Sequence, residues 1–239
     1  MGDKECKMVK ADKYFRPTNL IALALLFMTL VGVSGCANAL FTAAYLIKGN
    51  EVDPEFKKEI KEIPKHSKMV VICRSPYQTL FGIDDPSKTL SVALTKALAD
   101  KLDEKKKLEW IPIDKVDAMF DESEFANQSF EKMGAKLGAD YVFGVDIDSF
   151  NIHHSPQYLQ GKAHVNVRLV KVDSGEIICS KSLPQYVYPP NTPVAASDML
   201  EERFQTLYTV KLADEIGCCF YPYDPHEKVA LDNDVSRMR

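Results

Sequence analysis

The segment "LGADYVFGVDIDSF", residues 137–150, decides the fold because a helix ends and a central strand begins within it. Gly138 is a natural stop for the helix predicted over residues 127–137, since glycine adopts a left-handed backbone without strain. The residues that follow alternate between two faces, as in a half-buried strand. One face carries Tyr141, Phe143, Val145 and Ile147, and the other carries Val142, Gly144, Asp146 and Asp148.

A hairpin follows this strand. In residues 162–172, small and branched apolar residues alternate with polar ones, so one face is core and the other is wet, as antiparallel sheets allow. The apolar set is Ala163, Val165, Val167 and Leu169, and the polar set is Lys162, His164, Asn166 and Arg168. Gly175 supplies the turn in "VDSGE", and residues 177–183 return as the paired strand.

The flanking segments complete an α/β domain. Residues 69–73, "MVVIC", predict a buried strand, and residues 108–113 predict a second one. The helix between them has Ser87 as its expected cap and a buried stripe of leucines at residues 90, 94, 98 and 102. A short helix is expected after Asp114, with the loops 74–85 and 185–193. The closing helix is expected to be capped by Ser197 and to bury Leu200, Phe204, Leu207 and Tyr208.

These elements predict a single two-layer or three-layer sandwich, with a mixed sheet, a C-terminal antiparallel hairpin and packed helices. The chain has 239 residues, a formal charge of −4 and 46% hydrophobic residues, which is ordinary for a globular domain. No basic stripe with interleaved aromatics is visible, so nucleic acid is not an expected partner. The cysteines lack paired C-x-x-C spacing, so no zinc site is expected.

The first 36 residues have the layout of a bacterial lipoprotein signal. Residues 1–19 contain five basic and three acidic residues, and residues 20–33 contain no charge. A basic segment, a short apolar run and small residues are typical of a secretory signal. The run ends in Val33, Ser34, Gly35 and Cys36, which resembles the lipobox, where cleavage precedes a cysteine that is then lipidated. Ala37 after the cysteine favours the outer membrane, facing the periplasm.

This interpretation divides the chain into a signal peptide (1–35), a lipidated N-terminus and tether (36–67), the α/β domain (68–220) and a disordered tail (221–239). Residues 54–62 within the tether could form a turn or two of helix. The alternative for the first segment is an uncleaved signal-anchor helix over residues 20–47. Its apolar run before the cysteine is shorter than the roughly 20 residues that a span needs.

The search for chemistry finds no nucleophile-elbow, P-loop, dinucleotide-binding or zinc-protease motif. Asp146, Asp148, His153 and His154 form the one constellation that could ligate a metal or support hydrolysis. Adjacent histidines point apart on a strand, so a solvated strand end is the preferred interpretation, with neither metal nor cofactor. Asp173 is read as a turn residue rather than a catalytic acid.

Aromatic and sulfur side chains offer two further hypotheses. Tyr77 and Phe81 in the loop after the first strand could form a partner groove with Trp110, although core packing is preferred for Trp110. Cys73 and Cys179 could pair in an oxidising periplasm, but two small buried hydrophobes are preferred. A bond between Cys218 and Cys219 would strain the backbone.

Two segments resemble a group of envelope lipoproteins. Residues 137–150 resemble the glycine-alanine-aspartate-tyrosine strand of this group, and "VRLVKVDSGEIICSKS", residues 167–182, resembles its next hairpin, with Ser174 where the group commonly has threonine. The group includes the curli-secretion channel lipoprotein, the lipoprotein activators of penicillin-binding proteins and the N-terminal domain of the Tol-system β-propeller protein. The resemblance implies an α/β sandwich that binds proteins or assembles, without catalysis.

We therefore expect a lipid-anchored, non-enzymatic protein that binds or scaffolds partners in envelope assembly, secretion or wall-synthesis regulation. One alternative is a metal-dependent or hydrolytic envelope enzyme that uses the Asp146–His154 constellation. The other is a subunit of an oligomeric envelope ring, that is, a homo-oligomer. The sequence does not identify the envelope partner.

Overall fold

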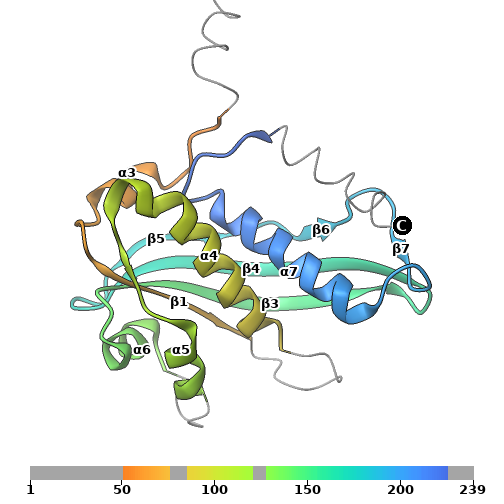
Figure 1. Ribbon diagram of the computed structural model, residues 1–239, viewed down its shortest axis with the longest axis horizontal. Coiled ribbons are helices and arrows are strands. Elements are labelled where there is room, and N and C mark those ends of the chain that lie inside the picture. Colours follow the sequence, from red (N-terminus) through yellow and green to blue (C-terminus); the bar gives the residue numbers. More distant parts are fainter. Residues whose placement is uncertain (1–50, 76–84, 121–127, 226–239) are drawn as a thin grey trace, which may run out of the picture. The chain divides into compact units, whose positions relative to one another are not determined.

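The computed structural model describes residues 51–75, 85–120 and 128–225, and it confirms the α/β fold (Figure 1). Its helices are α3 (Lys57–Glu62), α4 (Pro86–Lys106), α5 (Ile113–Phe120), α6 (Phe130–Leu137) and α7 (Glu201–Gly217). Its strands are β1 (Lys68–Arg74), β2 (Glu109–Trp110), β3 (Tyr141–Ser155), β4 (Tyr158–Lys171), β5 (Ile177–Ser182), β6 (Tyr186–Tyr188) and β7 (Val194–Ala195).

The described strands form one open mixed sheet in the order β2-β1-β3-β4-β5, with β6 and β7 paired to the far part of β4. Strands β2, β1 and β3 are parallel, which the intervening helices allow, whereas β3, β4 and β5 are antiparallel and joined by tight turns. The turn before β5 has Gly175 at a φ of 70°, as expected. The long β3–β4 hairpin therefore forms the centre of the sheet.

Helices α4 and α7 cover one face of this sheet and enclose the larger core (Figure 1). The leucine stripe of α4 is buried as expected, and Phe143 of β3 is fully buried in the same core. Helices α5 and α6 cover the other face beside β1, the first part of β3 and the end of β4, where Ile72, Val142 and Val170 lie in a second apolar cluster. The half-buried strand expected over residues 141–148 is thus buried on both faces at its start.

Several local expectations are corrected. The N-cap of α4 is Asp85, whose carboxylate accepts a hydrogen bond from the Ser87 amide, because Pro86 occupies the first helical position. Helix α7 begins later than expected, with Leu200 as its N-cap and no side-chain cap bond. Leu200 is 77% exposed rather than buried, because it precedes the first helical turn. The second strand shrinks to Glu109–Trp110 because Pro112, two residues after Trp110, cannot donate a hydrogen bond to the sheet.

The proline-rich segment also departs from a plain loop. Residues 186–188 and 194–195 pair with β4 as β6 and β7, because β4 extends well beyond the end of β5 and has open hydrogen-bonding groups there. Tyr188 at the end of β6 is fully buried. This segment is therefore part of the sheet.

Both ends of the domain lie outside the boundaries expected for it. The short helix expected over residues 54–62 exists as α3, but its flanks Phe56 and Ile63 are buried in the main core. Val52 pairs with Tyr223, and Phe56 donates its amide hydrogen to the Cys219 carbonyl. Apolar residues in the expected tether and tail therefore belong to the fold, whose described part runs from residue 51 to residue 225. Residues 1–50 and 226–239 lie outside it.

Candidate functional site

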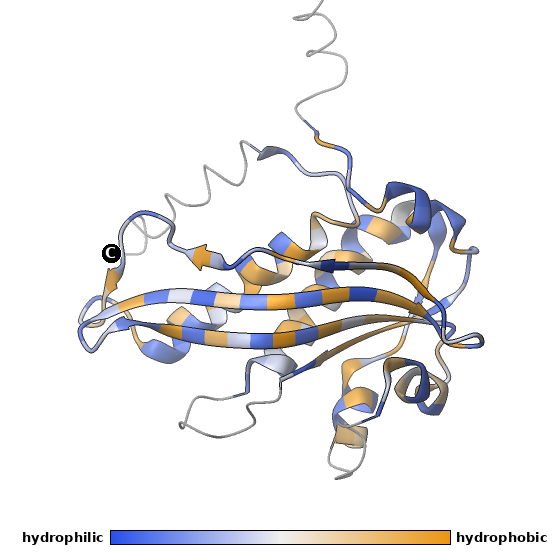
Figure 2. Ribbon diagram, turned by 180° about the vertical axis from the view of Figure 1, so that it is seen from behind, coloured by the Kyte–Doolittle hydropathy of each residue, from blue (hydrophilic) through white to orange (hydrophobic). Residues whose placement is uncertain are grey.

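We call the sheet face opposite α4 and α7 the outer face. It begins where α6 ends its cover of β3, at Asp146, and continues along β3, β4 and β5. Figure 2 shows the alternation of polar and apolar residues along the two long strands on this side. The polar set expected on β4, namely Lys162, His164, Asn166 and Arg168, is half-buried on this face, as predicted.

The first part of the outer face is an arginine–carboxylate bridge. Asp146 on β3 accepts hydrogen bonds from Arg74 at the end of β1 and from Arg168 on β4. The distance from the Arg168 nitrogen to the Asp146 oxygen is 2.6 Å. Arg74 also donates to the Gln128 carbonyl at 2.8 Å. Both guanidinium groups lie over the Phe130 ring, at 4.4 and 5.5 Å from its centroid, which adds cation–π attraction. The bridge therefore ties three strands to the start of α6.

The second part is a hydrogen-bonded row across three strands. His164 on β4 contacts Asp148 on β3 through Nδ1 at 2.8 Å and Ser182 on β5 through Nε2 at 3.3 Å. Asn166 donates to the same Asp148 oxygen at 2.6 Å. A register shift lies at Asp148, since Ile147 opposes Val165 and Ser149 opposes His164. Such a bulge redirects a side chain, and here it brings the carboxylate to the neighbouring strand.

The structure does not gather the four residues proposed as a metal or hydrolytic site. Asp146 is held by two arginines and Asp148 by His164 and Asn166, while His153 pairs with Glu201 at 3.1 Å. His154 is exposed. Within the described residues no cluster of three or more His, Cys, Asp or Glu could hold a metal ion.

Trp110 packs against the core, which confirms the interpretation preferred from the sequence over a partner groove. Its ring stacks on Phe143 with centroids 6.0 Å apart, and its indole N–H donates to Asp103 at 3.0 Å. Tyr77 and Phe81, the other members of the proposed groove, lie outside the described residues. Asp173 lies in the β4–β5 turn, as expected, where a hydrogen bond with Lys171 lowers the pKa of its carboxyl.

None of the described cysteines forms a disulfide. Cys73 and Cys179 lie on β1 and β5, which β3 and β4 separate, so the preferred interpretation as buried hydrophobes is confirmed. Burial raises the pKa of each thiol to about 12. Cys218 and Cys219 are also buried and unbonded to each other.

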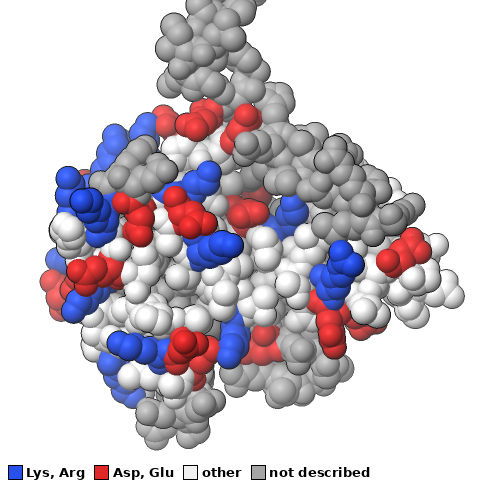
Figure 3. Space-filling view, in the orientation of Figure 1, with Lys and Arg blue, Asp and Glu red and all other residues white. Residues whose placement is uncertain are grey.

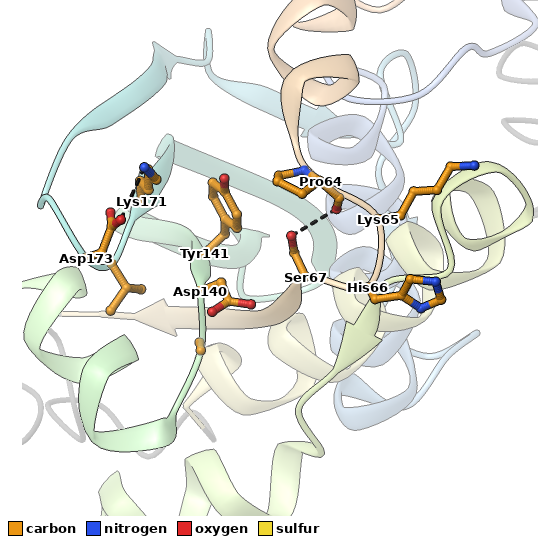
Figure 4. Close-up of a pocket in the computed structure, with 10 residues that line it drawn as sticks. Pro64, Lys65, His66, Ser67, Asp140, Tyr141, Lys171 and Asp173 are labelled. Carbon is orange, nitrogen blue, oxygen red and sulfur yellow. Dashed lines mark hydrogen bonds and ion pairs between the residues drawn. The ribbon is translucent and has the colours of Figure 1, made fainter.

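A pocket of about 470 Å³ lies at the opposite end of the sheet from the β3–β4 turn, between the α3–β1 connection, the start of β3 and the β4–β5 turn. Figure 4 shows Tyr141 and Ser67 at its centre, whereas the side chains of Lys65 and His66 point away from it. Lys171 is paired with Asp173, and the Asp140 carboxylate accepts the Lys68 amide at 2.7 Å. Its charged groups are thus engaged in structural contacts or directed elsewhere, and they do not converge on a ligand.

The lipobox residues Val33, Ser34, Gly35 and Cys36 lie outside the described residues. No helix in the described part of the chain has the length and apolar character needed to cross a membrane.

The comparisons with known proteins identify no family. No family profile and no curated protein matches the sequence. Solved structures with a similar fold include the PelC dodecamer from Paraburkholderia phytofirmans, with 10% identity, a TM-score of 0.40 and coverage of 65% of this chain and 86% of that chain. Lipoprotein GNA1162 from Neisseria meningitidis has 14% identity, a TM-score of 0.38 and coverage of 63% and 98%. The LpoB C-terminal domain from Escherichia coli has 16% identity, a TM-score of 0.33 and coverage of 51% of this chain and 83% of that chain.

Sequence reasoning missed two residues of the outer face, Arg74 and Ser182. Arg74 is predicted to lie in a loop, although on an extended strand it shares a face with Val70 and Ile72. The sequence places Ser182 on the returning strand but gives it no facing partner. Alternation within this strand, where Cys179 and Leu183 are apolar and Ser182 lies between them in phase with Ser180, would have put Ser182 on the polar face, opposite Asn166.

Proposed function

We propose that this chain is a lipid-anchored protein of the bacterial envelope, facing the periplasm from the outer membrane, whose α/β domain binds a protein partner. The observation that carries the proposal is the lipobox-like sequence from Val33 to Cys36 at the end of an uncharged run that follows a basic segment. A cysteine at that position is the acceptor for lipid. The fold adds a domain that is compatible with recognition.

The fold limits how far the domain can reach from such an anchor. Because Val52 already pairs with Tyr223, only residues 37–51 separate Cys36 from the fold, rather than a tether extending to residue 67. Fifteen extended residues span at most about 50 Å. A partner must therefore come close to the membrane that holds the lipid.

The outer face has the properties of a recognition surface. The carboxylates of Asp146 and Asp148 are each held by side chains of neighbouring strands, so these groups are already ordered before a partner arrives. Ordering a long side chain on binding costs about 0.5–1.5 kcal/mol, and a pre-organised surface avoids this cost. In contrast, the face of α4 and α7 in Figure 3 carries scattered charges of both signs.

Labelling with a fatty acid in the native host tests the anchor. We expect the wild-type chain to incorporate label and to lose residues 1–35, and Cys36→Ala to remain unlabelled and uncut. Cys6→Ala is the matched control, because Cys6 lies in the leader and is removed with it. Label retained in Cys36→Ala would contradict the proposal, as would an unlabelled wild-type chain that keeps residues 1–35.

Photo-crosslinking tests the partner surface. A photoreactive residue at Lys162, on the outer face, should give a discrete crosslinked product in intact cells. The same residue at Lys96, on the exposed side of α4, is the control and should give none. Products of equal yield from both positions would show that the outer face is not the preferred surface.

A further inference from the structure

The row formed by Asp148, His164 and Ser182 has the connectivity of an acid, a base and a nucleophile. The carboxylate contacts Nδ1 of His164 at 2.8 Å, and the hydroxyl contacts Nε2 at 3.3 Å. A single neutral tautomer, protonated on Nδ1, satisfies both contacts, since it donates to Asp148 and accepts from Ser182. This is the arrangement by which a histidine removes a proton from serine in hydrolases on unrelated folds.

We propose that Ser182 is a nucleophile toward carboxylic esters, with His164 as its general base and Asp148 as the residue that positions the imidazole. This activity goes beyond partner binding and runs against the sequence-based expectation that the domain is not an enzyme. Asn166 holds the second contact to Asp148 and so restricts the carboxylate to the position that His164 needs.

The neighbourhood of Ser182 provides access and a donor. Asp148, His164 and Ser182 all lie on the outer face, beyond the cover of α5 and α6, and the hydroxyl belongs to β5, the last strand of the described sheet. The Leu183 amide donates to Val165 of β4 at 3.0 Å. Because amides along a strand alternate in direction, the Ser182 amide points away from β4, toward the open edge. An amide of the nucleophile itself can stabilise the developing oxyanion.

The reaction balances with water as co-reactant. Ser182 Oγ attacks the ester carbonyl while His164 Nε2 takes its proton, and the bond to the alcohol oxygen breaks as His164 returns the proton to that oxygen. Water then attacks the acyl-serine and loses a proton to His164. As the bond from the acyl carbon to Ser182 Oγ breaks, His164 returns that proton to Oγ, which releases the carboxylic acid and restores the serine. The Asp148 carboxylate stays ionised and stabilises the protonated imidazole in both steps.

A fluorophosphonate probe on the full-length chain in detergent tests the proposal. We expect one covalent adduct, located on Ser182 by peptide mass analysis. Ser180→Ala is the matched control for Ser182→Ala, because Ser180 lies on the same strand and face, is also exposed and opposes Arg168 rather than Asn166. The adduct should persist in Ser180→Ala and disappear in Ser182→Ala.

The base and its positioning residue are tested by rate. His164→Gln should slow adduct formation by about a hundredfold or more, because general-base assistance contributes about 10²–10⁴-fold. Asp148→Asn should slow it while leaving circular dichroism unchanged. With p-nitrophenyl acetate, a burst of p-nitrophenolate equal to the protein concentration should appear in wild type and not in Ser182→Ala. The absence of an adduct, an adduct elsewhere, or rates that ignore His164 would overturn the proposal and leave the row as a structural ladder.

Discussion

Replacing Gly161 by alanine should destabilise the domain through one identifiable collision. A Cβ at this position of β4 would lie 2.3, 2.4 and 2.5 Å from three ring carbons of Tyr208 on α7. Carbon atoms in contact are normally about 3.5–4.0 Å apart, so the ring would have to retreat by about 1.2 Å. Tyr208 of α7 can therefore lie this close to β4 only because residue 161 is glycine, which has no side chain.

The Tyr208 ring has no room to retreat. It is fully buried, stacked on Tyr186 at 6.0 Å between centroids and packed on Phe150 at 5.4 Å. Its hydroxyl donates to the Tyr186 carbonyl at 2.9 Å. Overpacking a core costs about 1–3 kcal/mol, and losing this hydrogen bond adds about 1 kcal/mol. We expect Gly161→Ala to lower the free energy of unfolding by about 3 kcal/mol and the melting temperature by about 6–12 °C.

Urea unfolding followed by the fluorescence of Trp110, the single tryptophan of the chain, measures this cost. Gly138→Ala is the control, because it has no heavy atom within 4 Å of the added Cβ and only strains a backbone with a φ of 72°. It should cost about 1 kcal/mol. In a Tyr208→Leu background the Gly161→Ala cost should largely vanish, since the two changes are coupled. A Gly161→Ala cost no larger than that of Gly138→Ala would refute the reasoning.

Three other predictions follow from burial and charge. Cys73 and Cys179 should resist a thiol reagent at pH 8 until urea unfolds the chain, because burial raises the pKa of each thiol to about 12. Labelling of either cysteine in the folded protein would contradict their burial. In the unfolded chain these thiols have a pKa near 9.0, so the stability that comes from keeping them protonated is complete below that pH. It declines as the pH rises from 9 toward 12, and the melting temperature should fall over this pH range. Asp146→Asn should cost about 2 kcal/mol by weakening two charged hydrogen bonds. Asp173→Asn, at an exposed pair, should leave the urea midpoint nearly unchanged in the same assay.

Local patterns predicted the centre of the fold well. The helix stop at Gly138, the alternation along β4 and the turn at Gly175 each depend on residues close in sequence, and each is present in the structure. These features need only backbone geometry and the period of two, so they survive whatever packs around them.

Features that depend on distant partners could not be predicted in this way. Strands β6 and β7 exist because β4 is long enough to offer pairing groups beyond β5, which no local pattern shows. Phe56 is buried because residues 218–221 return to meet it, although its charged neighbours are typical of a tether. The row from Asp148 to Ser182 spans three strands, so no contiguous motif encodes it.

The change of character along β3 explains why the candidate site lies where it does. Gly144 lets Phe130 of α6 lie directly on the sheet, since a Cβ there would be 2.6 Å from the Phe130 ring. One step further, Asp146 binds the arginines at the rim of this cover, and beyond it Asp148 is exposed. Along β3, the outer face is thus covered by α6 at Gly144, ion-paired at Asp146 and exposed at Asp148. Because ion pairs fix Asp146 to β1 and β4, the neighbouring row of Asp148, His164 and Ser182 is held in place without being buried. A recognition or reaction surface requires this combination of order and access.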